Sequence, residues 1–516
     1  MVRVLKFCLM PCSNMIKNSP DLAARARDIA LKLTSWPSVT GTKDETDFAN
    51  RLAVLIDGFD TTWTEAIEDD AAQRCNVFAL KRGRTKRTVV LTGHFDVVPV
   101  TDFGPLEPLA FDPEKLLPEI IARLKASGEN PLALEDFKSG AFLPGRGLLD
   151  MKAGLAAGLA AAEAYEGDAS ILFVAVSDEE DRSAGARSAA PRLREIAMQH
   201  DLEIALVINL DAISDQGDGA KARVVTLGSI GKLLLTAFVV GKEAHAGYPQ
   251  DGVNAAYLAA ELIREFELAA ELSETTDSEV GAPPTCLYAK DLKRGYNVTT
   301  PAACWVYWNT MQHKSSAADV LEISRKLAIR AMERATLRVN RAVPVMTYRE
   351  VADLLKDEEI ERIAMQIDAL PYLDFPERCK LFTEQVWLQS GLAGPAVVLG
   401  FGSIPYPAVS LSDAGLERKI LNAVDPFGLG AVRYFAGISD MSFFGEASGD
   451  LKTAADNTPI WGTGFTLVDP AGYPCINIGP WGRDYHHWLE RLHAPYAFET
   501  LPRVLLSVID AVCKAG

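Results

Sequence analysis

Residues 87–96 read RTVVLTGHFD, a short apolar run that ends in an imidazole and a carboxylate. The run at 87–92 is rich in β-branched side chains and largely apolar on both faces, which is typical of a parallel strand in a helix-covered sheet. His94 and Asp96 follow this predicted strand directly. Because ligand sites in open parallel sheets form beyond the carboxyl ends of the strands, this stretch predicts both a fold class and the place of a site.

Two more apolar runs of this kind occur along the chain, with alanine-rich helical segments next to them. We predict strands at 171–176 and 204–210 and helices at 152–165 and 185–199. Strands that alternate with helices indicate an α/β domain with a mixed, largely parallel sheet and helices on both faces.

The pattern changes near residue 228, after which two long amphipathic helices and three strands follow without the earlier alternation. These elements are predicted at 233–240, 254–272, 285–290, 302–309 and 317–338. They indicate an α+β domain of residues 229–342, inserted into a larger domain of residues 1–228 and 343–516.

The rest of the larger domain is less regular. Strand-like runs at 396–400, 431–435 and 475–478 are assigned to its sheet. Two long connections, residues 101–144 and 347–392, have no role that the sequence indicates.

Composition narrows the class of protein. A chain of 516 residues exceeds what one hydrophobic core serves, so two domains are expected. A net charge of −17 disfavours nucleic acid and anionic membranes as partners. The eight cysteines are scattered, which fits free thiols in a reducing cytoplasm. We expect no membrane span and no signal at residues 2–10, where Pro11 follows the apolar run.

Acidic side chains follow the other predicted strands as His94 follows the first. An acidic run at 178–181 comes after one strand, Asp211 comes after another, and Asp150 lies just before a helix. Crowded carboxylates repel one another unless cations neutralise them. Carboxylates together with imidazole suit zinc, with cobalt or manganese as alternatives.

The two adjacent glutamates of the acidic run require different roles. Neighbouring side chains on an extended or turning segment point apart. Therefore one of Glu179 and Glu180 can bind metal while the other takes a proton from an attacking water. Asp96 can accept the proton of the second imidazole nitrogen of His94.

Each of these residues has a structural explanation when it is taken alone. A single histidine is often structural, an acidic run is usually a solvated loop, Asp150 could cap its helix, and Asp211 could end its strand. The metal hypothesis depends on all four segments reaching the same edge of one sheet.

Seven segments, in order along nearly the whole chain, resemble the metallopeptidase family that contains aminoacylase, glutamate carboxypeptidase, acetylornithine deacetylase and succinyl-diaminopimelate desuccinylase. The segments are GHFDVVP (93–99), GLLDMKAG (147–154), SDEED (177–181), NLDA (209–212), GKEAHAGYP (241–249), GISDMSFF (437–444) and HHWLE (486–490). Within this family, residues 296–301, 305–309 and 480–496 resemble the arginine-utilisation subgroup of the RocB type.

The resemblance implies a site for two divalent metal ions, with zinc expected. Asp150 would bridge the ions, His94 and Asp211 would complete one position, and Glu180 and His486 would complete the other. The family spacing places a glutamate four residues after the last histidine, which selects His486 and leaves the neighbouring histidine as the alternative.

The resemblance also implies the remaining roles. Glu179 matches the general base and Asp96 the carboxylate that orients the first histidine. In related enzymes the histidine that matches His245 reaches the site of a partner subunit from a lid domain. The resemblance therefore implies that residues 229–342 form a lid and dimerisation domain, and that the chain is a possible homodimer. Asn297 is a candidate for binding substrate in the same polar surroundings.

The implied reaction is hydrolysis of an amide bond in a small peptide or N-acyl amino acid by metal-activated water. One departure concerns the substrate: the lid strand reads WNTM at 308–311 and lacks the arginine that grips a substrate carboxylate in many relatives. Arg294 and Arg433 are candidate replacements. The alternative to an enzyme is a non-catalytic descendant that binds a metal or metabolite.

Overall fold

The computed structural model describes residues 20–68, 70–275, 281–370, 373–435, 437–447, 449, 451–459 and 468–514. The expectation for residues 2–10 lies outside this range. Among the described residues, no helix has the length and apolar character needed to cross a membrane. The six described cysteines are free thiols, as expected.

The larger sheet has eight strands in the order β1-β2-β5-β3-β6-β17-β8-β16. Its strands are β1 Thr61–Ala66, β2 Cys75–Lys81, β5 Ser170–Val176, β3 Arg87–His94, β6 Glu203–Asn209, β17 Cys475–Asn477, β8 Val224–Thr226 and β16 Gly430–Val432. The central strands β5, β3, β6 and β17 run parallel, whereas β1 and β2 are antiparallel to their neighbours. The predicted mixed, largely parallel sheet is therefore confirmed.

Helices cover both faces of this sheet because side chains alternate between two cores. Val89 and Leu91 of β3 join one core, and Val90 joins the other. The first core includes α1 Pro20–Thr34, α2 Lys43–Leu55, α5 Ala153–Ala164 and α15 Leu501–Cys513, and the second includes α6 Ala184–Gln199. Ten consecutive residues of α5 are buried, which explains why its sequence is apolar all round.

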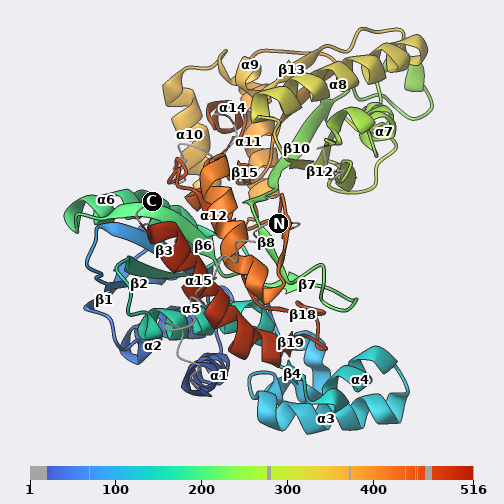
Figure 1. The fold of residues 1–516 in the computed structure, drawn as a ribbon. Helices are drawn as coiled ribbons and strands as arrows, with labels where there is room; N and C mark the ends of the chain where they lie inside the picture. The colour runs from blue at the N-terminus through green and yellow to red at the C-terminus, as the bar shows by residue number, and fades with distance from the viewer. Residues whose placement is uncertain are drawn as a thin grey trace, which may run out of the picture.

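The second sheet has five strands in the order β11-β12-β10-β14-β13. Its elements are β11 Thr285–Asp291, β12 Ala303–Gln312, β10 Gly231–Val240, β14 Ala396–Phe401, β13 Val345–Thr347, and the helices α7 Ala255–Phe266 and α8 Ala317–Val339. Both helices pack on one face of this sheet. Figure 1 shows the two sheets in separate lobes.

The assignment of residues 396–400 to the larger sheet was wrong, because β14 pairs with β10 in the second sheet. This strand is apolar on both faces, so its own sequence does not reveal its neighbours. The connection 347–392 forms α9 Tyr348–Ala352, α10 Asp357–Asp368 and α11 Phe375–Gln389, which share a core with the second sheet and with α6. We propose that the second module extends to residue 401, past the predicted boundary at 342.

The connection 101–144 forms a helical unit that ends in a strand. It comprises η1 Thr101–Leu109, α3 Pro113–Ser127, α4 Pro131–Ser139 and β4 Phe142–Pro144. The strand β4 belongs to a small sheet of order β4-β19-β18-β7, with β19 Arg491–His493, β18 Trp481–Arg483 and β7 Ile213–Ser214. This unit lies at the end of the lower lobe in Figure 1, beside the site described below.

The remaining described elements are short or irregular, apart from α12. They are η2 Leu148–Lys152, β9 Gly228–Ser229, η3 Pro249–Asp251, η4 Ala270–Leu272, β15 Val409–Ser410, α12 Ala414–Val424, η5 Asp425–Phe427, α13 Met441–Phe444, α14 Lys452–Asp456 and η6 Tyr496–Thr500.

Candidate metal centre

Asp150 lies between two histidines that come from opposite ends of the chain. Its Oδ1 is 3.1 Å from Nε2 of His94, and its Oδ2 is 3.3 Å from Nε2 of His486. His486 Nε2 is also 3.0 Å from Oε1 of Glu180. Each oxygen of one carboxylate thus faces a different imidazole, which is the arrangement that a bridging ligand requires.

Two more predicted residues lie beside this group. Asp211 Oδ1 is 3.9 Å and Glu179 Oε2 is 4.0 Å from Nε2 of His94. The ligand atoms of His94, Asp150 and Glu180 all lie within 4.8 Å of one another. The structure therefore brings the five predicted ligands and the predicted base together.

The electrostatics of this group fit divalent cations. Burial and the charge of Asp150 raise the pKa of Asp211 well above the usual range. Burial and the charge of Glu180 do the same to the pKa of Glu179. Burial lowers the pKa of His486, but hydrogen bonds with Asp150 and Glu180 prevail and raise it to about 10. Clustered buried carboxylates favour the binding of a cation between them. Imidazole and carboxylate are both ligands of zinc. The donor set fits one or two such ions.

The neighbouring histidine, His487, points to a different role. Its Nδ1 accepts a hydrogen bond from the backbone N–H of Leu489 at 3.2 Å. Among the described residues, no hydrogen bond or ion pair joins it to Asp150 or Glu180, which contact His486 instead. The geometry therefore supports His486 as the candidate ligand.

Asp96 contacts both the first histidine and the acidic turn. Its backbone carbonyl is 3.0 Å and its Oδ1 is 3.6 Å from Nδ1 of His94. Its carboxylate also accepts hydrogen bonds from the backbone N–H groups of Glu179 at 3.0 Å and Glu180 at 3.2 Å. Burial alone would raise the pKa of Asp96, but the hydrogen bond with His94 and the other donors lower it. The second contact was not predicted.

A buried ion pair fixes the turn that carries Asp150. Glu490 Oε2 accepts a hydrogen bond from Arg146 Nη1 at 2.9 Å, and Glu490 Oε1 accepts one from the backbone N–H of Leu149 at 3.2 Å. Burial raises the pKa of Glu490 to about 7. Sequence reasoning missed Arg146, although an arginine between two glycines directly before the GLLD segment was a visible signal.

A second buried network holds the turn that carries the two glutamates. Arg74 forms ion pairs with Asp70 at 2.8 Å and with Asp178, and Glu45 Oε1 accepts a hydrogen bond from the backbone N–H of Asp178 at 3.0 Å. Asp178 has a φ of 65°, a conformation that needs such support. Arg74 and Glu45 were not predicted, because they lie in segments with no metal motif.

Asp440 of the GISDMSFF segment is a further buried carboxylate near the centre. Burial raises its pKa to about 7, and its charge raises the pKa of both Glu179 and Asp211. Its motif was recognised from the sequence, but no role was assigned to it.

His245 and Asn297 lie in the second module, away from these residues. Both are exposed, and they neighbour each other through backbone pairing of His245 with Thr299. His245 Nδ1 accepts a hydrogen bond from Gly247 N–H at 3.0 Å, and Asn297 Oδ1 accepts one from Thr299 Oγ1 at 2.8 Å. Within the described residues, no hydrogen bond or ion pair joins either one to the metal-ligand candidates.

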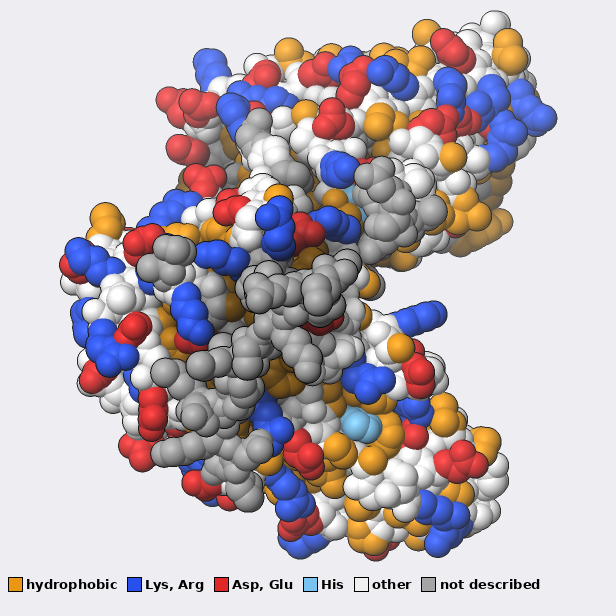
Figure 2. Space-filling view, viewed as in Figure 1, with side chains coloured by type: hydrophobic (Ala, Val, Ile, Leu, Met, Phe, Trp, Pro, Cys, Tyr) orange, Lys and Arg blue, Asp and Glu red, His pale blue; other side chains and the backbone are white. Residues whose placement is uncertain are grey.

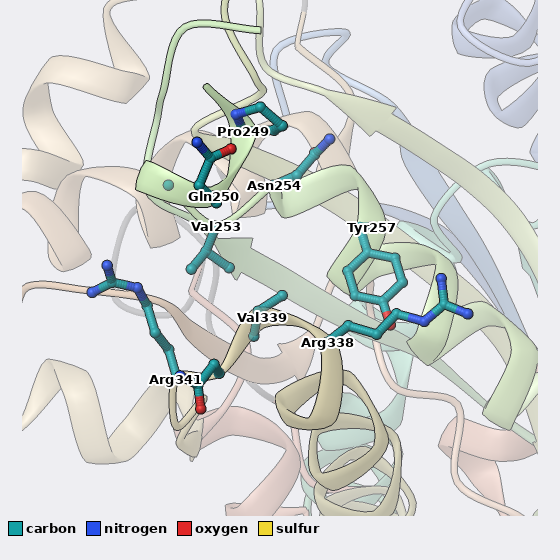
Figure 3. Close-up of a pocket in the computed structure, with 10 residues that line it drawn as sticks. Pro249, Gln250, Val253, Asn254, Tyr257, Arg338, Val339 and Arg341 are labelled. Carbon is teal, nitrogen blue, oxygen red and sulfur yellow. The ribbon is translucent and has the colours of Figure 1, made fainter. Parts of the chain in front are cut away.

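The surface is hollowed between the two lobes at the right of Figure 2. A separate cavity of about 760 Å³ lies in the second module, between the start of α7 and the end of α8. Tyr257, Arg338 and Arg341 are among the residues that line it (Figure 3). None of the metal-ligand candidates lines this cavity, so it is not part of the candidate centre.

Two relatives found by comparison with known sequences match nearly the whole length of the chain. The chain is 32% identical to the uncharacterized protein YqjN of Bacillus subtilis (strain 168), over 93% of this chain and 95% of the relative. It is 27% identical to Protein RocB of the same organism, over 94% of each chain. The predicted RocB-like subgroup is therefore supported.

Comparison with solved structures shows the fold. A tripeptidase from Staphylococcus aureus subsp. aureus Mu50 superposes with a TM-score of 0.51 at 15% identity, over 95% of this chain and 98% of that one. The YXEP protein of Bacillus subtilis, a dinuclear metal-binding peptidase, superposes with a TM-score of 0.50 at 10% identity, over 95% and 98%.

Residues 124–454, more than half of the chain, match the model of one peptidase family. This match agrees with the order of the motifs and with the cluster of ligand candidates at the edge of the sheet. The chain belongs to peptidase family M20/M25/M40, and it is a metallopeptidase or related amidohydrolase that depends on divalent metal.

Proposed function

We propose that the protein hydrolyses an amide bond in a small peptide or N-acyl amino acid, at a centre for two zinc ions. His94, Asp150 and Asp211 would hold one ion, and Asp150, Glu180 and His486 the other. The observation that carries this proposal is the carboxylate of Asp150, whose two oxygens face two different histidines. YXEP, with the same fold, is a dinuclear metal-binding peptidase.

Two zinc ions, when bound, supply positive charge that lowers the pKa of water and polarises the carbonyl group. Glu179 is the residue of this chain that moves the proton, because its carboxylate lies beside the ligand candidates, 4.0 Å from Nε2 of His94. The backbone N–H of Glu179 donates a hydrogen bond to Asp96, which fixes the position of the residue. Glu179 takes a proton from the attacking water, whose oxygen bonds to the carbonyl carbon. The C–N bond breaks, and Glu179 delivers the proton to the leaving nitrogen.

The substrate class is the finer part of the proposal. Residues 308–311 lie in β12, where Trp308 and Thr310 are buried. Because β12 contains no lysine or arginine, this strand offers no cation for a substrate carboxylate. Of the two candidate replacements, Arg433 forms an ion pair with Glu417 at 2.8 Å, whereas Arg294 is exposed in the loop that carries Asn297. We propose Arg294 and Asn297 as substrate-binding residues. We also propose that the protein acts in arginine utilisation in the cytoplasm.

The substitution Glu179→Gln tests the proposed base. We expect it to keep both metal ions and to reduce kcat by about 10²- to 10⁴-fold, because only proton transfer is removed. The assay is a panel of dipeptides and N-acyl amino acids, arginine derivatives included, with zinc, cobalt or manganese. Glu166→Gln, an exposed glutamate of the same domain, is the matched control and should keep full activity. Full activity in Glu179→Gln would exclude Glu179 as the base.

A further inference from the structure

Three contacts link the connection 101–144 to the loop that carries His486: one is direct, one goes to the residues at the two ends of the loop, and one goes through Arg146. This loop, residues 484–490, joins β18 to β19 in a hairpin, and β4 of the connection pairs with β19 along Arg491–His493. In Figure 1, α3, α4 and β4 lie beside β18 and β19 at the end of the lower lobe. The connection thus forms part of the support on which the loop stands.

Asp136 of α4 is the first and most buried of the three contacts. Its Oδ2 accepts hydrogen bonds from Arg483 Nη1 at 2.6 Å and Arg491 Nε at 2.7 Å. These arginines pair across the hairpin at the two ends of the loop. Arg491 also donates to the backbone carbonyl of Leu489 at 3.1 Å and to the carboxylate of Asp484, both inside the loop. One carboxylate therefore fixes both ends of the loop.

The other two contacts reach the loop from different sides. The guanidinium of Arg123, on α3, lies 4.2 Å from the ring centre of Trp488, a distance at which a cation attracts an aromatic face. Asp102, on η1, binds Arg146 at 2.8 Å, and Arg146 binds Glu490 at 2.9 Å. Two of the three contacts thus reach loop residues, Trp488 directly and Glu490 through Arg146, and the third holds the arginines at the two ends of the loop.

The loop needs support of this kind. The side chain of His486 is 43% exposed, so much of it borders solvent. His486 has a φ of 61° and Asp484 a φ of 54°, a left-handed region that residues other than glycine seldom occupy, although aspartate and histidine do so more often than most. Without outside contacts the loop would lose the conformation that directs the imidazole at Asp150 and Glu180.

We propose that the connection 101–144 is a brace that positions His486. It would thereby set the affinity of the second metal position, the one formed by Asp150, Glu180 and His486. Asp136 is its central positioning residue. The inference rests on the proposed two-ion centre, and it assigns a role to a segment that the metal motifs do not include.

The test is a metal titration of the metal-depleted protein, with zinc binding followed by calorimetry and the number of bound ions by elemental analysis. We expect two ions per chain for the wild type. Asp136→Asn removes the charge at nearly constant size, and we expect the affinity for the second ion to fall about 10- to 100-fold, as is usual for residues that orient a ligand. The first ion should bind as in the wild type. Asp136→Glu keeps the charge, so its affinity for the second ion should lie between that of the wild type and that of Asp136→Asn.

Lys115→Ala is the matched control, because Lys115 lies in the same connection, is exposed, and among the described residues forms its ion pair with Asp112 alone. Two ions bound by folded Asp136→Asn with wild-type affinity would overturn the brace. If Asp136→Asn does not fold, Arg123→Gln decides, with an expected loss of about two- to fivefold for an exposed cation–π contact; no change would overturn the brace. A wild type that binds fewer than two ions would instead refute the proposed centre, and the brace with it.

Discussion

Glu45 shows at the scale of one residue how the acidic turn depends on protonation. Burial raises its pKa to about 8, and the charge of Asp96 adds to the effect. An acid whose pKa is higher in the folded than in the unfolded chain stabilises the fold fully below its unfolded pKa of about 4.5. This contribution is then lost as the pH rises through the folded pKa.

We therefore expect the free energy of unfolding of the wild type to fall between pH 5 and pH 8 more steeply than that of Glu45→Gln, which has no proton to lose. The variant would lose some stability at every pH, because its amide offers one acceptor oxygen where Glu45 uses two, for the N–H groups of Gly41 and Asp178. Urea unfolding of both proteins across this pH range provides the measurement. Parallel pH profiles would contradict a raised pKa at Glu45.

Helix α5 is the element that brings Asp150 close to Asp211. A Cβ at Gly154 would lie 2.0 Å from the carbonyl oxygen of Leu210, the residue before Asp211. We expect Gly154→Ala to lower the free energy of unfolding by about 1–3 kcal/mol, since α5 must move away from backbone atoms that cannot yield. The gain in helix propensity, at most about 1 kcal/mol, is smaller.

Gly158→Ala, one turn later, is the control for this prediction. There the added Cβ would meet Cδ1 of Leu210 at 2.6 Å, and a leucine side chain can rotate away. Urea unfolding should therefore show a smaller loss for Gly158→Ala than for Gly154→Ala. Equal losses would mean that the approach of α5 to the end of β6 does not limit the packing.

The elements also show what local sequence can and cannot predict. β3 and β5 were predictable because a strand that is buried on both faces has a local signature. The strand ends indicated the places of His94 and of the acidic run, but the choice between Glu179 and Glu180 as ligand came from the family resemblance. Partners across long sequence separations have no such signature. Asp136 with Arg483, and Arg146 with Glu490, are separated by more than 340 residues, and only the folded chain brings them together.

At the scale of the whole molecule, the two lobes are linked by a shared core. Phe238 and Trp305 of the second sheet belong to the same cluster of buried side chains as Val90 and Leu172 of the larger sheet. Sequence periodicity predicted two modules but did not reveal this shared core. It cannot show which strands pair across a domain boundary, so β14 was assigned to the wrong sheet.

The position of His245 leads to a prediction about assembly. His245 is exposed in the second module, and within the described residues no hydrogen bond or ion pair links it to Asp150 or the other ligand candidates. If it stabilises the charge on the carbonyl oxygen during hydrolysis, it must reach a site of a second copy of the chain or move within its own chain. We propose the first, a homodimer in which each second module serves the partner's centre.

Mixing two inactive variants distinguishes these arrangements. Glu179→Gln lacks the base and His245→Ala lacks the lid histidine, so in a mixed dimer one of the two sites would keep both residues. We expect each variant alone to be nearly inactive and an equal mixture, after subunit exchange, to recover up to about one quarter of wild-type activity, since half of the dimers are mixed and each has one intact site. Sedimentation at the assay concentration checks that dimers are present. Dimers that exchange subunits without any recovery would show that His245 acts within its own chain or takes no part in the reaction.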